Sequence, residues 1–137
     1  MRYKLVPHTA DMGIKLANQT LKGLFEDAAF ALFDILTDIK KIKPQFRKEI
    51  SVQAVDIEEL LNTFLGKLLE EFTVENNLIS KVEIQNLEDK KLTAIISGEP
   101  YNPQKYSIKI EIKAITFNDL YVKKTKTGYE AQVILDV

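Results

Sequence analysis

The strongest constraint on the fold of this chain is an amphipathic pattern that begins after Asp56. Apolar side chains recur there at every third or fourth position, which places them on one face of an α-helix. The string Asp56-Ile-Glu-Glu59 resembles a capping box, in which side chains bond the free backbone groups at a helix start. The apolar face consists of Ile57, Leu60, Leu61, Phe64, Leu65, Leu68, Leu69 and Phe72. The solvent side is expected to hold Glu58, Asn62, Lys67, Glu70 and Glu71. This helix therefore needs another layer to pack against.

A second helix is predicted over residues 20–37. Its apolar residues also follow a period of about 3.6, and Thr20 is a plausible N-cap that accepts a bond from the first turn. Glu26, Asp27 and Asp34 lie off the apolar stripe. The chain thus offers two helices of similar design, each with one face to bury.

The remaining segments alternate apolar and polar residues with a period of two, which is typical of half-buried strands. Strands are predicted over 46–54, over 108–114, in a hairpin within 82–96 that turns at Glu88-Asp-Lys90, and in a last hairpin around Lys126-Thr-Gly128. Apolar residues make up 45% of the chain and charged residues 28%, as in an ordinary globular protein. We predict an α+β fold: a single layered domain over residues 1–137, with two amphipathic helices packed on a mostly antiparallel sheet.

Composition excludes several kinds of function. The 137 residues include no cysteine, which rules out disulfides, thiolate zinc sites and cysteine nucleophiles. A net charge of −1 argues against holding DNA or RNA by bulk electrostatics. No apolar run is long enough to span a membrane, so we expect a cytoplasmic protein with no membrane partner. The basic clusters at 40–43 and 123–126 are interpreted as solvated loops, with contact to a phosphate or an acidic surface as the alternative.

Catalytic motifs are also scarce. There is no Gly-x-x-x-x-Gly-Lys-Ser/Thr string to hold phosphates. His8 is the only histidine, and no serine lies in a nucleophile-elbow motif, so a hydrolase triad is not expected. No catalytic residue is assigned.

The polar string at residues 7–13 is unusual because it interrupts two apolar, strand-like segments. It contains His8 and Asp11, which favour either a turn satisfied by its own backbone or a site for a metal or proton transfer. Asp136 and the carboxylate of Val137 strengthen the second reading. Carboxylate and carbonyl oxygens suit a hard cation such as calcium or magnesium, whereas one imidazole and no thiol disfavour structural zinc. This site requires that folding bring the two ends of the chain together.

Six strings, in order along nearly the whole chain, resemble the archease family. They are His8-Thr-Ala-Asp-x-Gly13, Leu24-Phe-Glu-Asp-Ala-Ala29, Asp56-x-Glu-x-Leu-Leu61, Ser97-Gly-Glu99, Glu111-Ile-Lys-Ala-Ile-Thr116 and Val133-Ile-Leu-Asp-Val137. One departure is Asn118, since the family commonly has a histidine there; an asparagine cannot take up a proton.

The resemblance implies a function and a site. Archeases activate the RtcB-type RNA ligase in tRNA splicing and RNA repair: they promote its guanylylation and multiple turnover, broaden its nucleotide use, and are not themselves enzymes. The resemblance also implies a bound divalent cation, calcium in the first place with magnesium as the alternative, held by Asp11, Asp136 and Val137. His8 and Lys113 are further candidate site residues. RNA would be reached through the ligase, and DNA is not an expected partner.

Two other functions stay open from the sequence. The same carboxylates could serve a small metal-dependent hydrolase that acts on RNA ends or nucleotides. An RNA-binding or chaperone-like module is the third possibility, and it would show salt-dependent RNA affinity.

Overall fold

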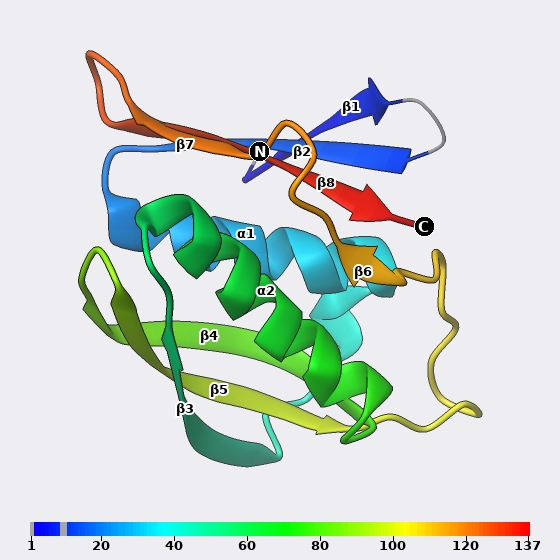
Figure 1. Ribbon diagram of the computed structural model, residues 1–137. Coiled ribbons are helices and arrows are strands. Elements are labelled where there is room, and N and C mark those ends of the chain that lie inside the picture. The colour runs from blue at the N-terminus through cyan, green and yellow to red at the C-terminus, as the bar shows by residue number, and fades with distance from the viewer. Residues whose placement is uncertain (1, 9–10) are drawn as a thin grey trace.

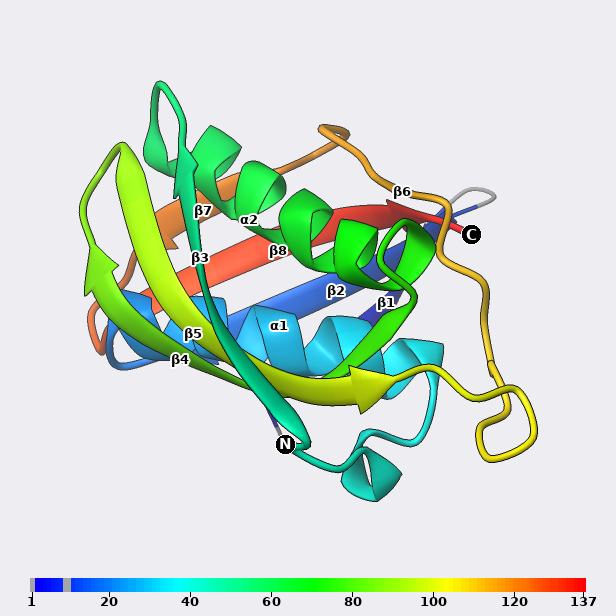
Figure 2. The same ribbon diagram turned by 90° about the horizontal axis from the view of Figure 1, so that it is seen from below.

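The computed structural model describes residues 2–8 and 11–137, and it has three layers (Figure 1). Two α-helices lie between two antiparallel sheets, one with strand order β1-β2-β8-β6, in which β7 also pairs with β8, and one with order β3-β5-β4. Figure 2 looks through the second sheet onto the helices, with β2 and β8 behind them. The expected α+β class is confirmed, but each helix has a sheet on both sides rather than one. The strands are β1 (Lys4–His8), β2 (Asp11–Asn18), β3 (Phe46–Gln53), β4 (Asn77–Leu87), β5 (Lys91–Pro100), β6 (Ala114–Ile115), β7 (Tyr121–Lys124) and β8 (Tyr129–Asp136).

The helices are α1 (Leu21–Leu36) and α2 (Ile57–Thr73), with a short 3-10 turn, η1 (Ile39–Lys41), after the first. Both predicted N-caps are confirmed. The Thr20 side chain accepts a bond from the Gly23 N–H at 3.0 Å, and the Asp56 carboxylate accepts one from the Glu59 N–H at 2.8 Å. In the described part of the chain, no helix is long and apolar enough to cross a membrane.

Covering each helix from both sides buries polar residues that the apolar stripe had left outside. Asn62 and Glu71, expected on the solvent side of α2, are only 8% and 2% exposed. The Glu71 carboxylate is matched by the Lys48 ammonium at 2.9 Å and by the Asn77 amide at 3.2 Å. Asp27, off the stripe of α1, is buried as well. Since a buried charge needs partners, these residues tie the layers together.

The strand predicted over 108–114 is wrong except at its last residue. The segment bends at residues 109–110; its isoleucines pack against the core, as the alternation predicted, but only Ala114 and Ile115 pair with another strand. Further back, the Lys109 N–H donates to the carbonyl of Leu36 at the end of α1, at 2.8 Å. The alternation of apolar and polar residues over 108–114 therefore indicates that one side of the segment is buried, and it does not indicate pairing in a sheet.

The predicted hairpins are confirmed. β4 and β5 pair on either side of the turn at residues 88–90, and β7 and β8 pair around the turn that contains Gly128. Gly128 has φ 156°, a conformation that side chains rarely adopt, and the Thr125 N–H donates to its carbonyl at 2.8 Å. The second hairpin brings the last strand into the centre of the first sheet.

Candidate metal centre

Strand pairing brings Asp11 and Asp136 together. The antiparallel register of β2 and β8 pairs Met12 with Leu135. One step further along this register stand Asp11, the first residue of β2, and Asp136, the last residue of β8. Figure 1 shows that β2 starts and β8 ends at the same end of the sheet. We call this pair, Asp11 and Asp136, the acidic edge.

Both carboxylates belong to the outer face of the sheet. Ile14, Val133 and Leu135 are fully buried in the core between the sheets. Because side chains alternate along a strand, residues at odd positions of β2 and even positions of β8 face the other way. Asp11 and Asp136 are therefore on one face, both half-buried. Side chains opposite one another on paired strands have Cβ atoms about 5 Å apart, close enough to share one ion.

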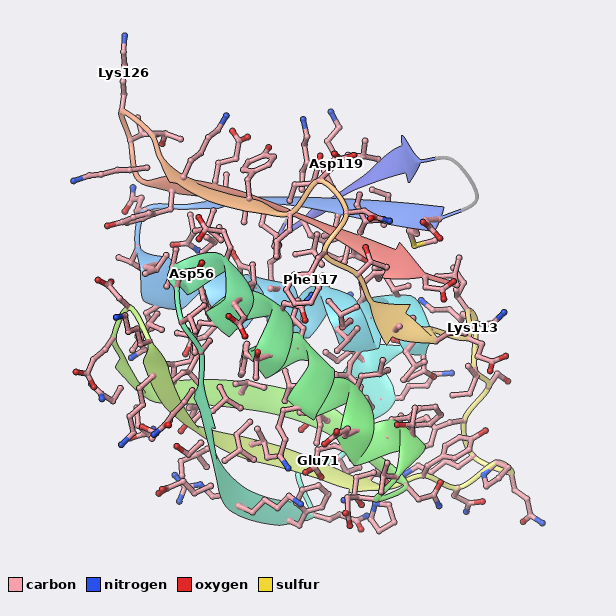
Figure 3. All side chains as sticks on the ribbon, in the orientation of Figure 1. Asp56, Glu71, Lys113, Phe117, Asp119 and Lys126 are labelled. Carbon is pink, nitrogen blue, oxygen red and sulfur yellow. The ribbon has the colours of Figure 1, made fainter. Side chains whose placement is uncertain are left out.

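The other candidate site residues lie around this edge. Lys113 donates its backbone N–H to the Asp136 carbonyl at 2.8 Å, and its side chain is exposed at the end of the molecule (Figure 3). The side chain of Val137 packs against the core, which holds the chain end at the acidic edge. The backbone of His8 pairs with Asp11 in the β1–β2 hairpin, but the His8 side chain lies outside the described residues, as do residues 9 and 10.

Gly13 lets the three strands at this edge pack closely. A Cβ atom at this position would lie 3.0 Å from the Val6 carbonyl oxygen and 3.2 Å from the Ile134 Cδ1. Such contacts are tighter than about nine in ten real ones, so a side chain here would require the Val6 backbone or the Ile134 side chain to give by a few tenths of an ångström. In the string Asp11-x-Gly13, the glycine thus allows β1 and β8 to pack closely beside the strand that carries the Asp11 carboxylate.

The donor set fits a hard divalent cation. Two carboxylates opposite one another on paired strands repel, and a doubly charged ion would neutralise both. Among the described residues, no three His, Cys, Asp or Glu side chains gather to hold a metal. An ion at the acidic edge therefore needs main-chain oxygens or water in addition, which suits calcium or magnesium and not structural zinc.

A turn at residues 116–120 lies next to this edge, and its contacts were not predicted from the sequence. The Thr116 backbone N–H and hydroxyl both donate to the Ile134 carbonyl, at 3.0 and 2.9 Å. The buried Asn62 of α2 donates its amide to the Thr116 carbonyl at 3.0 Å. Asn118 is exposed in the turn, and its N–H donates to the Thr116 hydroxyl at 3.2 Å. The only sequence signal was that Thr116 ends one of the six strings.

A second acidic group, Glu99, is satisfied within the chain. It is 4% exposed and accepts bonds from the Lys43 N–H at 2.6 Å, the Lys105 ammonium at 3.0 Å and the Tyr106 hydroxyl. Burial alone would raise the pKa of this carboxyl, but the bonds from Tyr106, Lys43 and Lys105 hold its pKa below the usual range. Glu99 therefore links the loop that contains Lys43 to the loop that contains Lys105 and Tyr106, and it is not a ligand site.

The three-layer fold defines the class of protein. It matches the solution structure of Methanobacterium thermoautotrophicum protein 1598 with a TM-score of 0.78 and 26% identity, over 99% of each chain. A crystal structure from Thermotoga maritima, described as an archease and possible chaperone, has the same fold; its TM-score is 0.69 at 18% identity, over 98% of this chain and 96% of that one.

Sequence comparison identifies the family. Residues 3–137 match the model of the Archease protein family (MTH1598/TM1083). The chain is 38% identical to Protein archease of Thermococcus kodakarensis, over 95% of this chain and 94% of the relative. It is 34% identical to Protein archease of Methanosarcina acetivorans, over 99% and 96% of the two. The chain belongs to the archease family, as its motifs indicated.

Proposed function

We propose that this protein is a metal-binding accessory factor that activates an RtcB-type RNA ligase. The observation that carries the proposal is the acidic edge: the fold brings Asp11, from the start of the chain, beside Asp136, at its end. Family membership supports the choice of partner. The proposed role is to promote ligase guanylylation and multiple turnover and to broaden nucleotide use, in tRNA splicing and RNA repair.

The residues at the edge would hold the ion and present it. Asp11 and Asp136 supply carboxylate oxygens, and Val137 supplies a main-chain oxygen, while the Lys113 N–H fixes the Asp136 carbonyl. A bound divalent cation would supply positive charge for phosphate oxygens in the ligase active-site region. We propose activation of another enzyme rather than catalysis because the chain belongs to the archease family.

Ligase guanylylation, followed as transfer of labelled GTP to the ligase, tests the proposal. The wild-type protein should speed the reaction at substoichiometric amounts, whereas Asp11→Asn and Asp136→Asn should not. These changes remove a charge with little change in shape, so folding should be unaffected. Glu83→Gln, on the outer face of the other sheet, is the matched control and should stimulate normally. If wild-type protein has no effect, the function is wrong; if both aspartate variants stimulate fully, the metal role is wrong.

The hydrolase alternative predicts a different result. A metal-dependent hydrolase would convert RNA ends or nucleotides with no ligase present. We expect no product when the protein and a divalent cation are incubated alone with these substrates.

The description of the Thermotoga maritima relative as a possible chaperone favours a chaperone-like mode of activation, in which the protein acts by binding the ligase.

A further inference from the structure

Phe117 is an exposed aromatic side chain on a rigid turn. It is 64% exposed to solvent. The turn is nonetheless well fixed: Thr116 is bonded to the Ile134 carbonyl through two donors, and Asp119 has φ 49°, which suits a tight turn. An ordered backbone loses little further entropy when its side chain is buried by a partner. Phe117 therefore has the character of a binding anchor, a role in which aromatic residues are enriched.

An open strip of α2 lies beside this turn. Asn62 bonds the Thr116 carbonyl at 3.0 Å, and Gly66 follows one helical turn later on the same side of the helix. A Cβ atom at Gly66 would meet nothing within 4 Å. No contact with the described residues requires a glycine there, although glycine weakens a helix interior. Figure 3 shows Phe117 next to α2, on the face of the molecule turned to the viewer.

The charges near Phe117 and the start of α2 are acidic. Asp119 follows Phe117 within the turn, and Asp56, Glu58 and Glu59 form the start of α2. A partner surface that fits here should be basic around its apolar centre, because complementary charge steers association. The Lys67 ammonium, one residue after Gly66, is 3.9 Å from Glu70 and is thus offset by a neighbour on its own helix.

We propose that Phe117 and the strip of α2 around Gly66 form the surface that docks on the RNA ligase. Phe117 would enter an apolar pocket with a basic rim, and the ligase backbone would approach α2 at Gly66. This inference rests on the proposed function for the identity of the partner. It is continuous with the acidic edge, since the turn is bonded to Ile134, two residues before Asp136. Docking here would hold the acidic edge against the same partner.

Binding of this protein to the purified ligase, measured by titration calorimetry at low and high salt, tests the surface. Phe117→Ala should raise the dissociation constant by about tenfold or more, as expected for the loss of an aromatic anchor. Val74→Ala is the matched control, because Val74 is an apolar side chain that is 71% exposed but lies at the C-terminal end of α2. The Val74→Ala variant should bind the ligase as tightly as the wild-type protein. Gly66→Gln should weaken binding while making the helix more stable, a combination that misfolding does not produce. Affinity should fall as salt is raised.

The outcomes separate the docking surface from the proposed function. If the wild-type protein binds and stimulates the ligase, and Phe117→Ala and Gly66→Gln bind equally well, the docking surface is wrong and the function stands. If the wild-type protein neither binds nor stimulates, the proposed function is wrong and the partner with it. A dimer of this protein that Phe117→Ala abolishes would assign the surface to a second copy and overturn the proposal.

Discussion

The two sheets differ in how their outer faces place carboxylates. On the three-stranded sheet, Glu83 is matched by Lys81 at 2.9 Å and by Arg47 at 3.7 Å. A hydrogen bond from Lys81 is the main cause that lowers the pKa of the Glu83 carboxyl. On the other sheet, the strand register places Asp11 beside Asp136, two charges of the same sign.

The rest of the outer face of the first sheet mixes both arrangements, since Glu130 accepts a bond from the Tyr121 hydroxyl at 2.5 Å and lies 3.6 Å from the Lys123 ammonium. Lys4 is directly opposite Lys15 in the β1–β2 register, and both are exposed on the outer face. Like charges opposite one another weaken a sheet. An edge that places two carboxylates together is suited to a cation from outside the chain. A face of matched pairs is only a solvated surface. This difference is why we propose the acidic edge of the first sheet as the ion site.

A divalent cation should stabilise the sheet with the acidic edge and leave the matched charges around Glu83 unaffected. Calcium at about one hundred times its dissociation constant should stabilise the fold by about 2.7 kcal/mol, which raises the melting temperature by roughly 10 °C. Asp136→Asn should lose this shift and Glu83→Gln should keep it. The measurement is thermal unfolding by circular dichroism, with and without calcium. An equal shift in Asp136→Asn would place the ion elsewhere.

Glu99 offers the converse test, since its partners are all within the chain. Glu99→Gln should lower the free energy of unfolding by about 2 kcal/mol at neutral pH, because bonds to a charged carboxylate are lost. The folded-state pKa of Glu99 is below its unfolded value. Its contribution is therefore present above the unfolded pKa, about 4.3, and is lost as the pH falls through the folded pKa.

Urea unfolding of wild type and Glu99→Gln at neutral and acidic pH measures this contribution. The gap between the two proteins should narrow below about pH 4, and calcium should not affect it. A gap that stays constant into acid would mean that Glu99 acts by shape and not by charge.

Sequence periodicity predicted the elements well and the layers less well. The caps at Thr20 and Asp56 and the turn at Gly128 follow from local chemistry, and each was found. The second sheet was not predicted, because periodicity along one helix reports its most apolar face and not what covers its sides. Asn62 and Glu71 were assigned to solvent for this reason, and both are buried.

The acidic edge was proposed from its residue types, and the family resemblance implied the same residues. Asp11 and Asp136 lie near opposite ends of the sequence, so only the β2–β8 register could show that they meet in the fold. The residues around Phe117 were not predicted as a surface at all. Their arrangement depends on Asn62, which the helical pattern had placed on the wrong side.

Gly13 and Gly66 differ in whether the surrounding fold has room for a side chain. Gly66→Ala should raise the free energy of unfolding by about 1 kcal/mol, because a Cβ there meets open space. Gly13→Ala should lower it by about 1 kcal/mol or more, because its Cβ would press on Val6 and Ile134. Chemical denaturation of both variants measures the signs. A loss of stability in Gly66→Ala would mean that this glycine serves the fold and not a partner.

The smallest effect concerns the protein without metal. Asp136→Asn removes one of two like charges on paired strands, so in the presence of a chelator it should raise the free energy of unfolding by about 0.2–1 kcal/mol. Glu83→Gln removes the shared partner of two cations and should not stabilise the fold. Urea unfolding under identical chelating conditions compares the two. A residue that makes the fold less stable in the absence of its ligand is retained for what it binds, and a gain in Asp136→Asn alone would show that the acidic edge is such a place. A loss instead would show that Asp136 is held by bonds within the chain, as Glu99 is.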